Sequence, residues 1–356
     1  MRVTTIDYHC AGEPFRIVLA GAPVLQGSTI LEKRRWALEN CDEVRKLLVN
    51  EPRGHADMYG CFVTDPEDDA ADLGVVFFHN AGYSTACGHG TIALVSWAIE
   101  SGRISAVEPE TTVTVDVPSG RLATVARLAG GRARSVRFRN VPAYVHSRAL
   151  RMGRFTVDIA YGGAFYAIVP AAQAGLRVEP RHLPQLIELG RGLKQHIEAE
   201  HQVRHPVHPE IEGIYGVIFT EGDRNVTVFA DGEVDRSPCG SGTSARLAVL
   251  DAAGELPRGE TLTHRSIVGS TFLGRVVAEA RGGGLITELD CTAPLTSRPE
   301  LVTEPDYQIA NAVLSPSPAA GTVISEQPSP IHAMFIPDPS LYVLRRPPST
   351  LRARAC

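Results

Sequence analysis

Two stretches of this chain are near copies of each other, Cys87-Gly88-His89-Gly90-Thr91-Ile92-Ala93 and Cys239-Gly240-Ser241-Gly242-Thr243-Ser244-Ala245. Both fit the pattern Cys-Gly-x-Gly-Thr-x-Ala, and both run into an apolar stretch with the character of a buried helix. The two cysteines are separated by roughly 150 residues, which is about the length of one domain. We therefore expect a duplicated architecture, with one thiol at the start of one buried helix in each half.

The position of each thiol predicts its chemistry. A cysteine just before a helix lies beside unpaired main-chain amides and the positive end of the helix dipole. Both features favour the thiolate, so we expect the pKa of Cys87 and of Cys239 to fall below the ordinary value of ~8.5. The small residues that follow, Gly88, Gly240 and Ser241, let a ligand approach the backbone, and the bare amides suit a carboxylate.

Two such helix starts placed face to face would hold a small amino acid by its carboxylate, with its α-carbon between the thiols. One thiolate would remove the α-proton, and the other thiol would supply a proton from the opposite face. The amides would also stabilise the carbanion, because its charge spreads onto the carboxylate. This chemistry requires no metal and no organic cofactor, so we expect neither.

Other interpretations of these residues stay open. Cys87 and Cys239 could be buried structural thiols, although glycine-rich helix starts are not typical of a core. His89 could form a hydrolase-like dyad with Cys87, but residues two apart on a helix do not face each other, so we favour His89 as a substrate-orienting or amine-contacting group. Asp235 stands four residues before Cys239 and is a candidate partner for a substrate ammonium, with an ordinary surface ion pair as the alternative.

Composition limits the class of protein. The chain has 356 residues, of which 44% are hydrophobic and 21% charged, with a net charge of −5 and no long basic run. These values are typical of a two-domain globular protein and exclude a nucleic-acid or polybasic membrane surface. Residues 1–24 lack a signal-peptide pattern, and the longest apolar run, 92–99, is too short to cross a bilayer. We expect a cytoplasmic protein with free thiols and assign no role to five of its cysteines, namely Cys10, Cys41, Cys61, Cys291 and Cys356.

Apolar spacing and turn residues divide the chain further. They predict helices at 29–51, 88–101, 183–197 and 240–253, with strands before each cysteine turn. We expect three parts: residues 1–140 with return strands near 285–310, residues 141–284, and a loosely attached proline-rich tail at 313–356. The histidines at 201, 205 and 208 could suggest a metal site, but Pro206 and Pro209 interrupt any helix that would align their rings. We therefore favour a solvated loop there and no metal.

Several further segments resemble the proline racemase family, which includes hydroxyproline 2-epimerases and trans-3-hydroxy-L-proline dehydratases. The resemblance covers about residues 1–290, in the family's order and approximate spacing. The matching segments are His9-Cys10-Ala11-Gly12-Glu13-Pro14, Glu51-Pro52-Arg53-Gly54-His55-Ala56-Asp57-Met58-Tyr59-Gly60, Gly82-Tyr83-Ser84-Thr85-Ala86-Cys87-Gly88-His89, Asp235-Arg236-Ser237-Pro238-Cys239-Gly240-Ser241-Gly242-Thr243 and Gly269-Ser270-Thr271-Phe272-Leu273-Gly274-Arg275.

This resemblance implies an α/β (α+β) fold of two pseudo-symmetric domains of the diaminopimelate epimerase type. Each domain would wrap a curved sheet around a central helix, with proline or a hydroxyproline bound in the interdomain cleft, and members commonly form homodimers. By motif position, Cys87 and Cys239 correspond to the paired acid/base residues. The resemblance also implies a set of substrate-binding residues: Gly88, His89, Gly240 and Ser241 at the carboxylate, Asp235 and His89 at the amine, and Tyr59 and Phe229 near the ring.

The reaction within the family stays open at this point. Tyr59 and Ser84 would make the pocket more polar than that of a strict proline racemase. In this respect the chain resembles the dehydratase branch of the family. Known dehydratases usually replace one of the two cysteines with Ser or Thr, whereas this chain keeps both. Because a second thiol can return a proton to the α-carbon, the chemistry favours a racemase or 2-epimerase. The alternatives are a trans-3-hydroxy-L-proline dehydratase and a non-catalytic amino-acid-binding homologue. Residues 291–299, which depart from the family's glycine-rich closing strand, motivate the second alternative.

Overall fold

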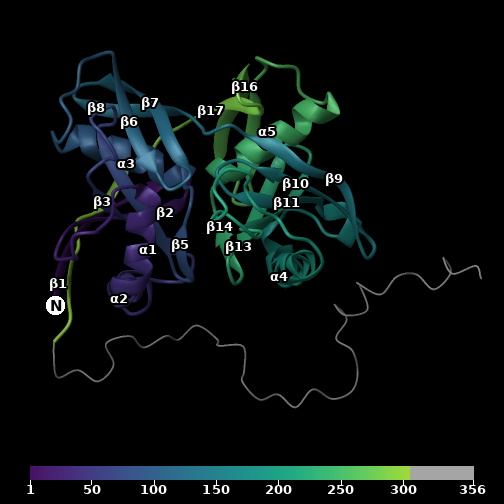
Figure 1. The fold of residues 1–356 in the computed structure, drawn as a ribbon, viewed down its shortest axis with the longest axis horizontal. Helices are drawn as coiled ribbons and strands as arrows, with labels where there is room; N and C mark the ends of the chain where they lie inside the picture. Colours follow the sequence, from purple (N-terminus) through teal and green to yellow (C-terminus); the bar gives the residue numbers. More distant parts are fainter. Residues whose placement is uncertain (305–356) are drawn as a thin grey trace, which may run out of the picture.

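The computed structural model describes residues 1–304, so the predicted tail at 313–356 lies outside the described residues. Two halves lie side by side, the first built around helix α3 (Gly88–Glu100) and the second around helix α5 (Gly240–Ala253) (Figure 1). All 19 strands of the described chain are hydrogen-bonded into one continuous sheet. This arrangement confirms the predicted fold class, and both helices begin at the predicted residues.

Every described strand and helix has defined bounds. The strands up to the middle of the chain are β1 (Arg2–Cys10), β2 (Glu13–Ala20), β3 (Tyr59–Thr64), β4 (Leu73–His79), β5 (Gly82–Ser84), β6 (Glu110–Val117), β7 (Gly120–Ala129), β8 (Arg132–Arg139) and β9 (Tyr144–Met152). The later strands are β10 (Phe155–Tyr161), β11 (Phe165–Pro170), β12 (Gly216–Glu221), β13 (Arg224–Phe229), β14 (Glu233–Asp235), β15 (Leu262–Ser266), β16 (Thr271–Glu279), β17 (Leu285–Cys291), β18 (Leu295–Ser297) and β19 (Glu300–Val302). The other helical segments are α1 (Ile30–Asn40), α2 (Asp42–Val49), α4 (Leu183–Glu200) and the 3₁₀ turns Ala171–Ala174 and Pro180–His182.

The two halves repeat one strand order, with β1 to β8 corresponding to β10 to β17. In each half a hairpin is followed by helices and then by a strand parallel to the second hairpin strand, β3 along β2 and β12 along β11. A second hairpin leads through a short strand, β5 or β14, into the cysteine turn and the buried helix. The next strand again runs parallel, β6 along β4 and β15 along β13. The internal repeat seen in the cysteine motifs therefore extends to the whole topology.

Burial explains why neither central helix presents a polar face to solvent along most of its length. Every residue of α3 from Gly88 to Ile99 is buried, as is every residue of α5 from Gly240 to Val249. Strands of the same half surround each helix, including β8 and β1 around α3 and β10 and β16 around α5. A helix without a polar face is stable only when it is enclosed in this way. Each enclosed helix gives its cysteine a fixed position at the helix start.

The end of the described chain returns to the first half. Strand β17 pairs antiparallel with β8, and β18 and β19 then pair antiparallel with β1. The segment that departs from the family pattern, 291–299, thus includes β18, whose Thr296 hydroxyl donates a 2.8 Å hydrogen bond to the carbonyl of Asp7. The exact domain boundaries at 140 and 284 stay a prediction.

The prediction of a single helix at 29–51 is wrong. The chain forms α1 and α2 instead, and Cys41 separates them with φ −120° and ψ 7°. Thr29 and Glu32 form a reciprocal capping box at the start of α1. The break has a packing reason, because Cys41 is fully buried and the residues that follow it pack into the core on the strongly amphipathic α2. Helical spacing alone did not reveal this change of direction.

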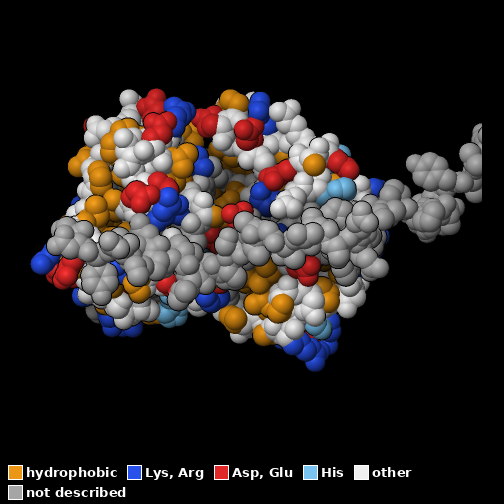
Figure 2. Space-filling model, turned by 90° about the horizontal axis from the view of Figure 1, so that it is seen from below, with side chains coloured by type: hydrophobic (Ala, Val, Ile, Leu, Met, Phe, Trp, Pro, Cys, Tyr) orange, Lys and Arg blue, Asp and Glu red, His pale blue; other side chains and the backbone are white. Residues whose placement is uncertain are grey.

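The described surface agrees with the charge pattern of the sequence. On the face in Figure 2, acidic and basic side chains are interspersed wherever the described atoms are visible, without one extended basic patch. Among residues 1–304, no helix has the length and apolar character needed to span a membrane.

Candidate active site

The two buried helices meet start to start. A Cβ added to Gly88 would lie 2.5 Å from the Cα of Gly240, and one added to Gly240 would lie 2.4 Å from the Cα of Gly88. Both distances are far inside van der Waals contact, so this approach of two backbones requires glycine on each side. The amide-rich ends of α3 and α5 therefore face the same space.

That space is a small cavity between the halves. Its free volume is about 10 Å³, room for about one water molecule. Nine of the ten predicted site residues line it, and three further residues do so as well: the lining consists of Tyr59, Ala86, Cys87, Gly88, His89, Tyr166, Tyr215, Phe229, Asp235, Cys239, Gly240 and Ser241. The tenth, Ser84, does not line this cavity. Its hydroxyl donates a 2.7 Å hydrogen bond to the carbonyl of Ala86, and the residue lines a neighbouring outer cavity instead.

Cys87 caps the start of α3. Its backbone is extended, with φ −152° and ψ 99°, and its sulfur accepts a 3.2 Å hydrogen bond from the amide of Gly90. The ring of His89 approaches the same sulfur, with Nε2 at 3.4 Å. The expectation that Cys87 and His89 do not face each other is therefore wrong. The rule for residues two apart holds inside a helix, whereas Cys87 stands just outside it with an extended backbone.

His89 is nevertheless a poor base in this site. Burial lowers its pKa to about 3, so the imidazole is neutral at physiological pH and binds a proton only weakly. The edge of its ring packs on Tyr59, with the ring centroids 5.0 Å apart and the planes at 82°. These features fit a group that orients a ligand better than one half of a hydrolytic dyad.

Cys239 lies in different surroundings. Its backbone has φ 67° and ψ 117°, an uncommon conformation for a non-glycine residue. The hydroxyl of Tyr166 lies 3.6 Å from the sulfur and 2.6 Å from the hydroxyl of Ser241. Asp235 accepts hydrogen bonds from the amide and hydroxyl of Ser237, and the Ser237 hydroxyl in turn accepts from the amide of Cys239 at 3.1 Å. This chain of bonds fixes the turn that carries the thiol.

The predicted lowering of the thiol pKa values is wrong for this closed cavity. Burial raises the pKa of Cys87, against the smaller opposite effect of the Gly90 amide, and burial together with the charge of Asp235 raises the pKa of Cys239. Desolvation disfavours the charged thiolate more strongly than the helix ends favour it. Burial also raises the pKa of Asp235, to about 6, so this carboxyl group is mainly ionised at neutral pH.

Strand β14 fixes Asp235 by binding the other half. The Glu233 carboxylate lies 3.1 Å from the ring of His79 and accepts a 2.8 Å hydrogen bond from the amide of Ala81. The Asp57 carboxylate accepts a 2.9 Å hydrogen bond from the amide of Val234. These contacts lie immediately before Asp235 in the chain, so they hold its carboxylate in the wall between the halves.

Two aromatic residues of the cavity were missed in the sequence. Tyr166 is on β11, and Tyr215 directly precedes β12. A detectable signal existed for Tyr215, because Tyr215-Gly216-Val217-Ile218-Phe219-Thr220 repeats the pattern of Tyr59-Gly60-Cys61-Phe62-Val63-Thr64 at equivalent strands of the two halves. The internal repeat of the cysteine motifs could have been used to find this second pair. Tyr166 carries no comparable signal.

The histidine-rich stretch forms no metal site in the described structure. Within residues 1–304, no group of three or more His, Cys, Asp or Glu side chains is arranged to hold a metal ion. His205 instead accepts hydrogen bonds from the amides of Val207 and His208, at 3.2 and 3.1 Å. The segment is a turn organised by one imidazole.

Comparison with known proteins identifies the family. Residues 5–306 match the family described as Proline racemase. The chain belongs to the proline racemase family. It is 44% identical to a trans-3-hydroxy-L-proline dehydratase of Bacillus cereus over 286 residues, which are 77% of this chain and 86% of that protein. It is also 45% identical to a 3-hydroxyproline 2-epimerase of Burkholderia multivorans over 295 residues, 80% of this chain and 88% of that protein.

A solved structure supports the same assignment. The hydroxyproline epimerase of Agrobacterium vitis, determined with bound trans-4-hydroxy-L-proline, superposes with a TM-score of 0.80 at 31% identity. The match covers 84% of this chain and 92% of that one. Relatives of this proline racemase family member therefore include both epimerases and dehydratases, so the reaction must be argued from the site.

Proposed function

We propose that this protein is a cofactor-independent enzyme that inverts the α-carbon of proline or a hydroxyproline, as a racemase or 2-epimerase. The observation that carries the proposal is the shared cavity, in which Cys87 and Cys239 lie at the abutting starts of two buried helices. Such helix starts present unpaired amides that suit a carboxylate. The carboxylate would bind at the turns of Gly88 and His89 and of Gly240 and Ser241.

Substrate binding would itself activate a thiol. Both thiols are protonated in the closed cavity, because burial raises their pKa values. An entering amino acid carries an ammonium group, and a positive charge nearby favours the thiolate. Asp235, ionised at neutral pH, would bind that ammonium, with His89 as a neutral neighbour. The enzyme would thus keep its bases inactive until the substrate is in place.

The proton balance of the inversion is simple. One thiolate takes the α-proton, and the electron pair of the broken C–H bond spreads onto the substrate carboxylate, where the helix amides stabilise it. The opposite thiol gives its proton to the other face of the α-carbon and becomes a thiolate. The two cysteines therefore exchange protonation states in each turnover, and the next substrate must be of the opposite configuration or the protons must equilibrate with water.

A dehydratase is the second candidate, and the phenol groups of Tyr59 and Tyr215 in the cavity wall favour it. In that reaction one thiolate removes the α-proton, the C–O bond at ring carbon 3 breaks, and the leaving hydroxide takes a proton from the newly formed thiol to form water. The elimination leaves an enamine, with a double bond between the α-carbon and ring carbon 3. Loss of the N–H proton and addition of a proton at ring carbon 3 convert this enamine into the cyclic imine. This reaction needs one thiol at the α-carbon, so Cys239→Thr would keep activity that Cys87→Ala loses.

A homodimer and a cytoplasmic location, both suggested by the family resemblance and composition, are part of the proposal, as are domain boundaries at 140 and 284. Sedimentation of the full chain measures the first of these directly.

The decisive experiment is a panel of L-proline, trans-3-hydroxy-L-proline and trans-4-hydroxy-L-proline in deuterium oxide, followed by NMR. Inversion appears as an epimer with deuterium at the α-carbon, and dehydration as an imine trapped by o-aminobenzaldehyde. Cys87→Ser and Cys239→Ser should each lower inversion by about 10²–10⁴-fold, because a serine hydroxyl is a far weaker acid. Cys291→Ser, outside the cavity, is the matched control. Retention of inversion in either active-site variant would eliminate the two-thiol scheme.

A further inference from the structure

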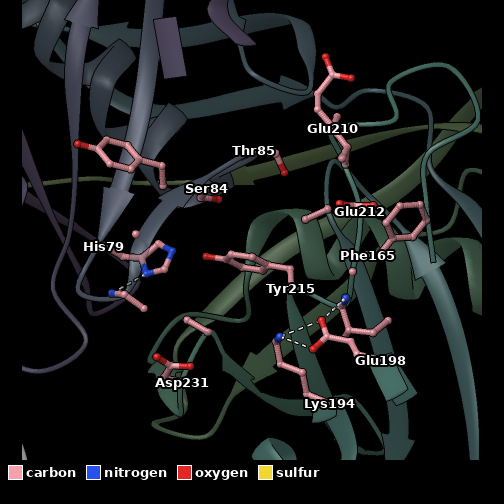
Figure 3. A pocket seen from close by; sticks show the side chains of 18 of the residues that line it. His79, Ser84, Thr85, Phe165, Lys194, Glu198, Glu210, Glu212, Tyr215 and Asp231 are labelled. Carbon is pink, nitrogen blue, oxygen red and sulfur yellow. Dashed lines mark hydrogen bonds and ion pairs between the residues drawn. The ribbon is translucent and has the colours of Figure 1, made fainter. Parts of the chain in front are cut away.

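A large cavity lies apart from the active site. The outer cavity beside the active site has a volume of about 330 Å³, and its wall includes Tyr215, which also lines the catalytic cavity (Figure 3). Another cavity, with a volume of about 680 Å³, shares no lining residue with either of these two. It lies between residues 119–121 of the first half and residues 205–208 of the second, and we call it the hinge cavity. Its volume is typical of a site for a small molecule.

The hinge cavity lies where the chain passes between the halves. Residues 140–142, which lead from β8 into the second half, line it, as do residues 282–284, which lead into β17 and back toward the first half. The amide of Ala143 donates a 2.8 Å hydrogen bond to the carbonyl of Leu285, and the amide of Leu285 donates a 2.7 Å bond in return. The closed catalytic cavity is too small for a five-membered ring, so the halves must separate for a substrate to enter. These two bonded passages are the place about which the halves would turn.

Three hydroxyl groups in the wall of the hinge cavity have no hydrogen-bond partner among the described residues. They belong to Ser119, Tyr144 and Tyr161. Ser119 is only 8% exposed and Tyr161 only 2%, and buried polar groups in native proteins are almost always bonded. Burial raises the pKa of Tyr144 to about 12 and raises that of Tyr161 as well, so both phenols keep their protons. A ligand that accepts several hydrogen bonds would satisfy these groups.

The rest of the wall indicates the kind of ligand. The ring of Tyr161 packs against Tyr144 at 5.2 Å and against His205 at 4.9 Å between centroids. Burial lowers the pKa of His205, and its Nδ1 accepts two amide hydrogen bonds, so the neutral ring carries its proton on Nε2 as a further donor. No Asp or Glu lines the cavity, and its permanently charged side chain is Arg121. Aromatic faces, several donors and a guanidinium suit a flat ring that carries a carboxylate.

We propose that the hinge cavity binds a small aromatic carboxylate, which holds the two halves together and slows the opening of the catalytic cavity. The ring would pack on Tyr144 and Tyr161, and the carboxylate would accept hydrogen bonds from the wall hydroxyls. Ser119 belongs to the first half and the two tyrosines to the second, so the full set of contacts exists only while the halves are closed. A ligand that binds the closed state more tightly shifts the equilibrium toward it. This binding does not depend on which reaction the two thiols perform.

Titration calorimetry of the full chain with benzoate measures the binding itself. We expect a Kd of about 1 mM or lower, and binding at least about tenfold weaker for benzylamine, which has the same ring with a positive charge. Ser119→Ala and Tyr144→Phe each remove one hydroxyl, from opposite halves, and should each raise the Kd for benzoate by about 5- to 50-fold. Tyr8→Phe is the matched control, because the Tyr8 hydroxyl bonds Glu100 and lines none of the three cavities. Its Kd should equal that of the wild-type protein.

Alkylation of Cys87 and Cys239 by iodoacetamide, followed by mass spectrometry, measures the opening. Both thiols are buried in the closed cavity, so the reagent reaches them only when the halves separate. A concentration of benzoate that saturates the wild-type protein should slow their alkylation at least about fivefold there and in Tyr8→Phe. The same concentration should slow it much less in Ser119→Ala and Tyr144→Phe.

Four results would overturn the proposal. They are no binding of benzoate at about 10 mM, equal binding of benzylamine, bound benzoate without any effect on alkylation, and slowing that both variants retain in full. The last result would mean that benzoate protects the thiols from inside the catalytic cavity. Thermal unfolding checks each variant, and if one fails to fold, the variant in the opposite half carries the same comparison. Neither measurement requires turnover, so a protein that inverts no amino acid would defeat the proposed function and leave this test intact.

Discussion

The turns at Cys87 and Cys239 have almost the same sequence and clearly different environments. Cys87 is extended and bonded to the amide of Gly90, with the His89 ring beside its sulfur. Cys239 has a positive φ, and its sulfur lies beside the phenol of Tyr166. The helix starts and the glycines are shared, while the side chains that surround each sulfur are not.

This difference separates two parts of the chemistry. The shared features, amides and close backbones, act on the carboxylate and α-carbon, which are the same in both enantiomers. The unshared features act on each thiol separately, so the two faces of the substrate meet an acid and a base of unequal strength. Changes in shared features should harm both halves alike, whereas changes in unshared ones should act on one thiol.

Among substitutions outside the two thiols, the largest effect on kcat/KM is expected at the shared glycine contact. Gly88→Ala and Gly240→Ala would each place a methyl group within 2.5 Å of the Cα of the opposite glycine. We expect each variant to lose at least about 100-fold in kcat/KM and about 1–3 kcal/mol in the free energy of unfolding, because the helix starts must separate. Enzyme assays and urea unfolding measure both quantities.

Gly282→Ala is the matched control for this comparison, since a Cβ there meets nothing within 4 Å. Equal losses in the two glycine variants would support a symmetric contact. If Gly240→Ala were harmless while Gly88→Ala was not, the two helix starts would have to be functionally independent.

The sequence predicted the shared features well and the unshared ones poorly. The starts of α3 and α5 follow from local composition, because a glycine-rich turn before an apolar run is visible in the sequence. The raised pKa values of the thiols depend on burial, which arises only when the two halves meet. Tyr166 approaches Cys239 from a strand 73 residues away in the chain, and no local pattern encodes that contact.

An effect of intermediate size on kcat/KM is expected when the pH is changed. It depends on Asp235, which belongs to the second half. The pKa of Asp235 is about 6, whereas that of His89 is about 3. Of these two groups, only Asp235 titrates between pH 4.5 and 8. As pH falls through 6, Asp235 gains a proton and loses its attraction for the substrate ammonium. The thiolate fraction falls over the same range, so log kcat/KM should climb with a slope of about 2 below pH 6 and about 1 above it.

Asp235→Asn should remove the steeper part of this profile. It also removes the negative charge that raises the pKa of Cys239, so that pKa falls and the thiolate fraction at pH 7 increases. Iodoacetamide should then alkylate Cys239 faster than in the wild-type protein, which can be followed by mass spectrometry even when turnover is lost. An unchanged alkylation rate together with an unchanged pH slope would contradict this role of Asp235.

The smallest effect is expected at Tyr166, which is specific to the Cys239 side. Tyr166→Phe removes one hydroxyl that bonds Ser241 and lies beside the Cys239 sulfur, and we expect kcat to fall by about 3- to 10-fold. The equilibrium constant of inversion fixes the ratio of kcat/KM in the two directions, so the asymmetry must appear in the individual kcat values. The direction in which Cys239 donates the proton should lose more, because the phenol stabilises the thiolate left behind.

Tyr161→Phe, at a buried phenol without a hydrogen-bond partner, provides the control. Equal losses of kcat in both directions would mean that Tyr166 supports the turn as a whole and that the two thiols are more alike than their surroundings indicate.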